Sequence, residues 1–195
     1  QREEEAVAWR CVNPSCPAQL KRKLLHFASR DGLDIEGFGE AVVDQLVDAG
    51  RLTDLAGVFG LTKDDLLKLE FFADKRADNL LAAIARAKEV PLSRLLFALG
   101  IPQVGEKTAR DLAGRYRTMD ALADAALEDL QAVPDVGPVV AEAVHAFFAQ
   151  AAAKALLKKL HKAGLDMAEP QAAVSADARL AGKTFVFTGE LETMT

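Results

Sequence analysis

A local pattern that recurs four times constrains the fold of this chain more than any other feature. In each copy an apolar residue, two variable residues, a second apolar residue and a small residue come directly before a segment of helical periodicity. The copies are turn 1 (Ile35-Glu36-Gly37-Phe38-Gly39), turn 2 (Leu69-Glu70-Phe71-Phe72-Ala73), turn 3 (Ile101-Pro102-Gln103-Val104-Gly105) and turn 4 (Val133-Pro134-Asp135-Val136-Gly137). They begin 34, 32 and 32 residues apart, at positions 35, 69, 101 and 133. A repeat of this length predicts one supersecondary unit that is copied and stacked.

The repeat keeps its register beyond the turns. Two sets of positions are equivalent, one made of Val43, Ala77, Ala109 and Ala141 and the other of Leu46, Leu80, Leu112 and Val144. Apolar spacing predicts helices over almost all of residues 30–150, preceded by a short helix over 20–28. The last copy continues into an alanine-rich segment, which predicts one long helix over about 138–163 that ends at Gly164.

The residues of the turns indicate a way of holding phosphate. Glycine lets the backbone bend sharply and approach a partner closely, and the helix that follows presents unpaired N–H groups and a partial positive charge. Four such turns in register are typical of the helix-hairpin-helix motif, which contacts the DNA backbone and does not read sequence. The candidate DNA-binding residues are Gly37, Gly39, Lys75, Arg76, Gly105, Lys107, Thr108 and Gly137. The same pattern also fits a helical repeat array that serves as a protein-interaction scaffold.

Turn 2 departs from the pattern. Ala73 replaces the final glycine, and Phe71 replaces the more open residue found at position 37. We therefore expect turn 2 to pack against the rest of the protein, while turns 1, 3 and 4 carry more of the binding. We also expect two pairs, turn 1 with turn 2 and turn 3 with turn 4, so that two hairpins face the two strands across one groove.

Composition limits the function classes. The 195 residues carry a formal net charge of −5, which argues against a broad electrostatic surface for nucleic acid. Half of the residues are hydrophobic, no apolar run is long enough to cross a bilayer, and the first residues QREEE lack signal-peptide character. We therefore expect a cytoplasmic protein without a membrane partner. Residue 1 is not Met, which predicts that the chain is a piece of a longer protein.

The only two cysteines, Cys11 and Cys16, form Cys-x4-Cys in a turn-rich segment. Structural zinc needs four ligands, so this pair alone predicts weak zinc binding or none. His26 is a possible third ligand, but its apolar neighbours favour a packed histidine. The pair reads as the second half of a four-cysteine site, with Cys11 and Cys16 as its metal ligands.

Three short sequences resemble the bacterial NAD-dependent DNA ligases: CVNPSCPAQ at 11–19, HFASR at 26–30 and DIEGFG at 34–39. In that family this region joins a four-cysteine zinc finger to four helix-hairpin-helix motifs, and a BRCT domain follows. The strand-like TFVFTG at 184–189, after LAGK, resembles the start of that BRCT domain.

The resemblance implies a mainly α fold of four tandem helix-hairpin-helix motifs, with a partial zinc finger before it and a truncated α/β BRCT strand after it. The expected divisions are a zinc-finger part at 1–19, a DNA-binding domain at 20–166, a linker at 167–178 and the BRCT start at 179–195. Within the domain, the repeats are expected near 35–50, 69–88, 101–116 and 133–150.

The family seals nicks in duplex DNA during replication and repair, so the implied partners are nicked double-stranded DNA and other domains of a parent ligase. In the family a lysine in a Lys-x-Asp-Gly motif attacks NAD and takes up AMP, which then passes to the 5′-phosphate at the nick. No Lys-x-Asp-Gly occurs here. We therefore expect this chain alone to be inactive, with no catalytic or NAD-binding residues; the parent enzyme would use NAD and Mg. Another repair enzyme with the same hairpins is the remaining alternative, against which the Cys-x4-Cys run argues.

Overall fold

The computed structural model describes residues 16–170, which form a mainly helical domain. The α-helices in this range are α1 (Pro17–Ala28), α2 (Glu40–Asp48), α3 (Lys63–Leu66), α4 (Asp74–Arg86), α5 (Leu92–Ala98), α6 (Glu106–Tyr116), α7 (Met119–Ala123), α8 (Leu127–Gln131), α9 (Pro138–Ala149) and α10 (Ala151–Lys162), with 3-10 helices η1 (Leu55–Gly60) and η2 (Ala87–Glu89). The mainly α prediction is confirmed. Cys11 and the expected BRCT start at 179–195 lie outside the described residues.

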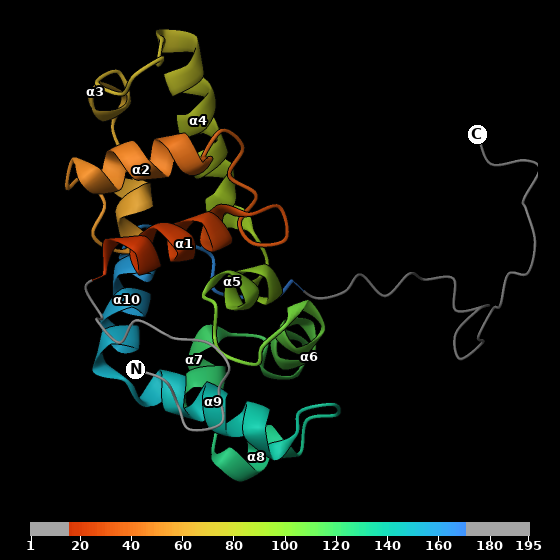
Figure 1. Cartoon of the computed structure of the whole chain (residues 1–195). Coiled ribbons are helices and arrows are strands. Elements are labelled where there is room, and N and C mark those ends of the chain that lie inside the picture. The colour runs from red at the N-terminus through yellow and green to blue at the C-terminus, as the bar shows by residue number, and fades with distance from the viewer. Residues whose placement is uncertain (1–15, 171–195) are drawn as a thin grey trace, which may run out of the picture.

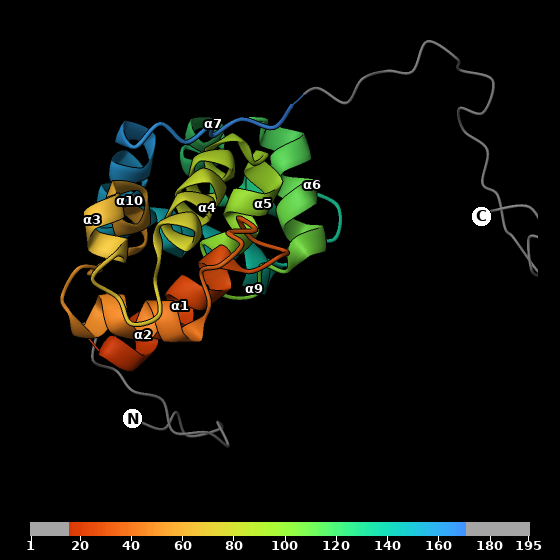
Figure 2. The ribbon, with the colours of Figure 1, turned by 90° about the horizontal axis from the view of Figure 1, so that it is seen from above.

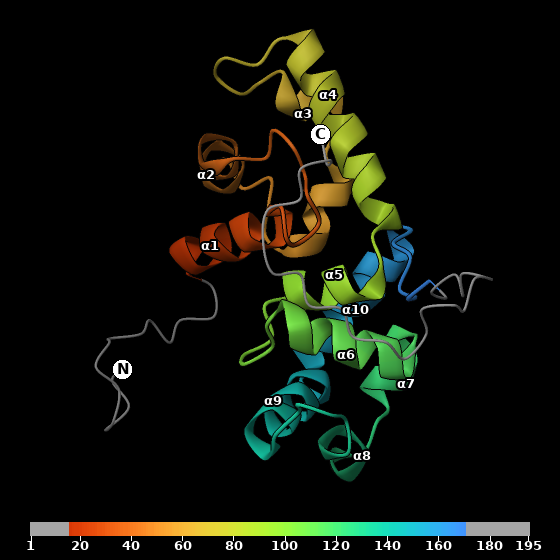
Figure 3. The ribbon, with the colours of Figure 1, turned by 90° about the vertical axis from the view of Figure 1, so that its right-hand side faces the viewer.

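The helices divide along the long axis of the domain. Helices α1 to α4 lie at one end and α5 to α9 at the other, as Figures 1 and 3 show. Helix α1 packs against both α2 and α5, and α10 packs against both η1 and α9, so these two helices join the ends. Viewed from above, α5 and α6 lie side by side near α4 (Figure 2), and α5 with α6 forms the most extensive helix contact.

The core confirms the register of the repeat. Val43, Ala77, Ala109 and Ala141 are completely buried, and Leu46, Leu80, Leu112 and Val144 are at most 1% exposed. Each copy therefore turns the same face of its second helix inward, and the four faces share one hydrophobic cluster. A copy on its own could not cover this apolar face, which is the physical reason that the units stack.

Helix α1 begins earlier than expected. The sequence predicted a helix over 20–28, but α1 starts at Pro17, with Cys16 in the extended conformation of an N-cap residue. Proline fits the first helical position because its missing N–H has no intrahelical partner there and its φ is already helical. Residues 17–19 therefore belong to the helical domain rather than to the zinc-finger part.

The predicted long helix over 138–163 is wrong. It consists of two helices, α9 and α10, which meet at an angle of 72°. Gln150 between them is extended, with φ −70° and ψ 131°. The bend allows Phe148 on α9 and Leu160 on α10 both to be buried, at 4% and 0% exposure. Burial of both faces outweighs the helix propensity of the alanine-rich sequence, which contains no breaker at this point.

The expected linker begins later than residue 167. The N–H groups of Leu92 and Met119 donate to the carbonyl oxygens of Ala168 and Met167, at 3.1 and 3.0 Å. The carboxylate of Glu169 accepts from the backbone N–H and the hydroxyl of Ser93, at 2.8 and 3.1 Å. The chain therefore crosses the starts of α5 and α7 as a bonded strap, and the domain extends beyond its predicted end at residue 166.

Within the described residues, no single helix is long and apolar enough to cross a membrane; only the bent pair of α9 and α10 passes a test of length and composition when the two are counted together.

Candidate nucleic-acid interface

All four turns share one backbone conformation. The third residue of each has a positive φ: 86° at Gly37, 61° at Phe71, 64° at Gln103 and 62° at Asp135. In each, the N–H of the fourth residue donates to the carbonyl oxygen of the first, at 3.2, 3.3, 3.1 and 3.1 Å from turn 1 to turn 4. A positive φ at this position with this bond is the pattern of a type II turn. Turns 2, 3 and 4 adopt it without glycine at the third position.

Buried apolar side chains hold the turns in this shape. The first residue of every turn is at most 8% exposed, and the fourth is at most 7% exposed in turns 1, 3 and 4. Phe72, the fourth residue of turn 2, is half-buried and packs against the same core. The two variable residues between them face solvent. The apolar-x-x-apolar spacing thus anchors the ends of each turn and leaves its tip outside.

The helices that follow the turns begin without a side-chain cap. Their N-cap residues Gly39, Ala73, Gly105 and Gly137 are extended, exposed and make no side-chain capping bond. Helices α1, α5, α8 and α10 also lack such a cap, whereas in α3 and α7 Thr62 and Thr118 accept bonds from the N–H groups of the first turn. The first N–H groups of α2, α4 and α6 are therefore available to another acceptor, as is the N–H of Val139 in α9, where Pro138 has none. The helix dipole favours an anion at each of these starts.

Side-chain contacts join the turns in two pairs, as expected. In the first pair, turns 1 and 2, the Gln45 side-chain oxygen on α2 accepts from the N–H of Glu70 at 2.7 Å. A Cβ on Gly37 would lie 3.9 Å from the Leu80 side chain on α4. In the second pair, turns 3 and 4, the Lys107 ammonium forms an ion pair with the Asp135 carboxylate.

The cation near turns 3 and 4, Lys107, is less available to a phosphate than the sequence indicated. The ion pair raises the pKa of Lys107 through its hydrogen bond to Asp135 and lowers the pKa of Asp135 for the same reason. Both side chains are exposed, so the pair can open to admit another anion. Thr108 is half-buried on α6 beside Lys107. No local sequence pattern indicates this ion pair, because its partners are 28 residues apart.

The cations at turn 2 are arranged differently. Lys75 is exposed, and among residues 16–170 no carboxylate lies within ion-pair distance of it. The acidic residues on the same helix, Asp74 and Asp78, are 3.0 and 2.8 Å from the Lys63 ammonium. Arg76 donates to the carbonyl oxygen of Phe71 at 3.1 Å and lies 4.3 Å above the ring of Phe72. Lys75 is thus available to a phosphate, whereas Arg76 holds the turn.

Phe71 takes no part in the expected packing of turn 2, and the expectation that turns 1, 3 and 4 carry more of the binding stays a prediction. Leu69 is buried, but Phe71 is 89% exposed. The positive φ of Phe71 directs the tip of the turn away from the core, whatever side chain it carries. The sequence could not show this, because an aromatic residue in an apolar segment is more often buried.

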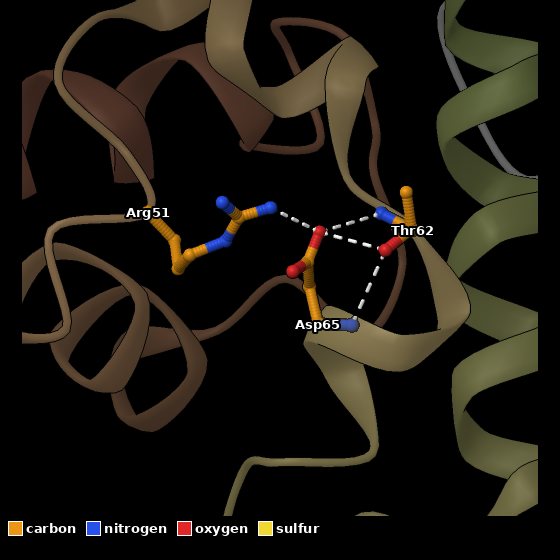
Figure 4. Close-up of polar contacts among 3 residues, drawn as sticks. All are labelled: Arg51, Thr62 and Asp65. Carbon is orange, nitrogen blue, oxygen red and sulfur yellow. Dashed lines mark hydrogen bonds and ion pairs between the residues drawn. The ribbon is translucent and has the colours of Figure 1, made fainter.

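A buried carboxylate fixes the segment that leads into turn 2. Asp65 on α3 is 7% exposed and accepts from the N–H and hydroxyl of Thr62, at 3.1 and 2.8 Å, while the Thr62 hydroxyl caps the helix in return (Figure 4). The Arg51 guanidinium lies 2.5 Å from the same carboxylate oxygen. The bonds to Arg51 and Thr62 lower the pKa of Asp65 to about 2, from an ordinary 3.8. This network orients α3, and through it turn 2, against α2.

The described residues hold no group of three or more metal-ligating side chains. His26 is packed, as preferred from the sequence: its Nε2 lies 2.8 Å from the carbonyl oxygen of Phe97, and the two rings are 4.7 Å apart. It therefore joins α1 to α5. Cys16 is the N-cap residue of α1, and Cys11 lies outside the described residues, so the proposed zinc half-site stays a prediction.

Comparison with known proteins relates this chain to a segment of DNA ligases. A family model described as "Helix-hairpin-helix motif" matches residues 94–157, which include turns 3 and 4. The DNA ligase of Endomicrobium trichonymphae is 44% identical over 192 residues, or 98% of this chain and 28% of that protein. The DNA ligases of Trichlorobacter lovleyi and Symbiobacterium thermophilum are 46% and 47% identical over 194 and 190 residues, again 28% of each protein.

This chain is homologous to a segment of DNA ligases. It spans about 28% of the length of the curated relatives it matches. The predicted resemblance to DNA ligases is confirmed, and the match at 94–157 places a helix-hairpin-helix motif in this ligase homologue.

Proposed function

We propose that this chain is the part of an NAD-dependent DNA ligase that clamps duplex DNA around a nick, without reading its sequence. Four tandem helix-hairpin-helix motifs, one at each turn, would form the clamp. The observation that carries the proposal is the repeated turn: four positive-φ tips, each followed by a helix whose first N–H groups have no side-chain cap. Backbone N–H groups at a helix start suit phosphate oxygens.

The proposal accounts for binding by an acidic chain. Phosphate contacts from backbone N–H groups hold the duplex in position and are the same for every base sequence. They neutralise no full charge, so few counterions are released on binding. We expect log K to fall with log salt at a slope on the order of −2 to −4, because each phosphate neutralised by Lys or Arg contributes about −0.9. A slope near −8 would contradict this binding mode.

Ligation itself belongs, in this proposal, to the parent enzyme. Adenylation there would use NAD and Mg with a lysine that this sequence does not contain in its Lys-x-Asp-Gly setting. The chain alone is expected neither to take up AMP from NAD nor to seal a nick. Cys11 and Cys16 would supply half of a zinc site completed by cysteines elsewhere in the parent enzyme, so a stoichiometric zinc content in this chain would contradict the half-site. The proposed compartment is the cytoplasm, where the duplex DNA of a bacterium lies.

The decisive test places carboxylates where phosphates would lie. The variant Gly105→Asp plus Gly137→Asp is expected to fold, because both glycines have negative φ and a Cβ at either would meet no other heavy atom within 4 Å. Aspartate is also a favoured N-cap residue, so unfolding should show unchanged or slightly higher stability. Affinity for a nicked and an intact duplex should fall on the order of 100-fold. Each new carboxylate would accept from the N–H groups that otherwise bond a phosphate, and its charge would repel that phosphate.

A matched control separates the effect of a carboxylate at the turns from the effect of a more negative net charge. Gly60→Asp plus Gly114→Asp adds the same two charges at exposed glycines that also have open space around them. Gly60 ends η1, and Gly114 lies near the end of α6, away from turn 3. The control should bind duplex DNA nearly as well as the native chain. Equal losses in both variants would mean that net charge governs binding, and no binding by the native chain would favour the protein-scaffold alternative.

A further inference from the structure

Phe71 occupies the tip of turn 2 in a conformation that folding alone does not favour. It is 89% exposed, more than the other exposed large apolar residues among 16–170, Val139 at 66% and Leu67 at 39%. Its φ of 61° is one that a bulky residue rarely adopts, because the Cβ crowds the following carbonyl oxygen. The same position holds Gly37, Gln103 or Asp135 in the other turns. An aromatic that is both strained and exposed calls for a role outside the core.

The neighbours of Phe71 fix it in place. The guanidinium of Arg76 donates to the Phe71 carbonyl oxygen at 3.1 Å and lies over the Phe72 ring, 4.3 Å from its centroid. The turn is also closed by the bond from the Phe72 N–H to the Leu69 carbonyl oxygen at 3.3 Å. The backbone of the tip is thus held from two sides, so little backbone freedom is lost when the ring meets a partner.

The surroundings of Phe71 favour an anionic partner with an apolar interior. Lys75 and the uncapped N–H groups of α4 lie just after the tip. Lys63 engages both carboxylates of α4, Asp74 and Asp78, so that Lys75 forms no ion pair within residues 16–170. The remaining carboxylate of the turn is the exposed Glu70. Duplex DNA has this combination, because its phosphates flank stacked bases.

We propose that Phe71 is a wedge that enters the minor groove and stacks against a base step while the first N–H groups of α4 hold the adjacent phosphate. The inference rests on the proposed duplex binding and adds an apolar contact to it. Aromatic side chains stack on any base because every base has a π-face, so the contact agrees with sequence-independent binding. Apolar side chains inserted from the minor groove also unstack and bend a duplex. Gly37, Gln103 and Asp135 cannot stack in this way, so turn 2 would differ from the other three.

The test follows base stacking and affinity together. Short nicked duplexes, each with 2-aminopurine at a different position near the nick, are titrated with the 195-residue chain. The native chain should raise the fluorescence of the probe at one or two adjacent positions, because unstacked 2-aminopurine is brighter. Phe71→Gly should abolish this rise and weaken binding on the order of tenfold or more. Its melting temperature should stay the same or increase, because glycine relieves the positive φ and no buried contact is lost.

Three further variants sharpen the result. Phe71→Trp should keep both the fluorescence rise and the affinity. Phe71→Lys tests whether position 71 needs only to contact a phosphate. If this variant regains the affinity that Phe71→Gly loses, but without the fluorescence rise, the wedge is overturned. Leu67→Ala, a change at a neighbouring exposed apolar residue outside the turn, should leave both readouts unchanged.

The outcomes separate this inference from the proposed function. If the native chain and Phe71→Gly bind the duplexes equally, the wedge is overturned and duplex binding stands. If the native chain binds none of the duplexes, both fall together. If Phe71→Gly lowers the melting temperature, the ring is covered by another part of the chain, and the wedge is again overturned.

Discussion

The first and second pairs of turns share a backbone conformation but differ in the side chains that their tips expose to a partner. The first pair has an exposed aromatic at Phe71 and an exposed cation at Lys75, whereas the second pair closes its own cation, Lys107, onto Asp135. The turn conformation is the same in both, and the first residue of every turn is buried. The difference shows that the core fixes the turn, while the solvent-facing residues can change its binding chemistry without changing its shape.

The two pairs also differ in how polar groups hold them. In the first pair a buried carboxylate, Asp65, joins the loop after α2 to α3, and the side-chain oxygen of Gln45 bonds to turn 2. In the second pair the polar link is the exposed Lys107–Asp135 pair, and extensive contact between α5 and α6 supports turn 3. Removing a carboxylate should therefore affect stability in the first pair and DNA binding in the second.

The largest expected effect is on stability. Asp65→Ala removes the acceptor of the Thr62 bonds and leaves Arg51 without its partner, which should lower the free energy of unfolding by about 2 kcal/mol. Asp135→Ala, the matched change in the second pair, should not change it measurably, because an exposed ion pair contributes little. Urea unfolding of both variants checks this. Equal losses would mean that the second pair relies on its ion pair as much as the first relies on Asp65.

Acid should weaken the first pair through the same carboxylate. The pKa of Asp65 is about 2 in the folded chain, below the ordinary 3.8 of an unfolded aspartate. The unfolded state therefore binds a proton first as pH falls, so this stabilisation is full above about pH 4 and disappears as pH falls through 2. Because Arg51 is half exposed, we expect the change to be about 1 kcal/mol. Melting temperatures of the native chain and Asp65→Asn should differ at neutral pH and converge near pH 2.

The sequence predicted the shared features of the two pairs better than their differences. The spacing of apolar residues located all four turns and the eight equivalent core positions, because burial repeats with the unit. It missed the bend at Gln150, since alanine-rich sequence has no local signal for a break. It also missed the outward direction of Phe71 and the Lys107–Asp135 pair, because both depend on where turns lie in space rather than on neighbours in the chain.

A smaller effect should distinguish the cations of the two pairs. Lys75→Ala removes an exposed cation at turn 2, so the slope of log K against log salt should become shallower by about 0.9. Lys107→Ala removes a charge already compensated by Asp135, so the slope should change little. Anisotropy titrations of one duplex over a range of salt concentrations measure both slopes. A larger change for Lys107 would mean that DNA opens the ion pair and that turn 3 gains a full cation on binding.

The smallest expected effect is a gain. Asp135→Asn keeps the shape of the side chain at the tip of turn 4 but releases Lys107, so duplex affinity should increase severalfold at low salt and the slope should steepen by about 0.9. The gain should vanish in Asp135→Asn plus Lys107→Ala, because the released cation is its source. Gln103 stands at the same turn position without a charge, so Gln103→Asn serves as a control that should change neither quantity. If Asp135→Asn weakens binding instead, the carboxylate itself positions the second pair on DNA, and the two pairs differ in more than the charge that they offer.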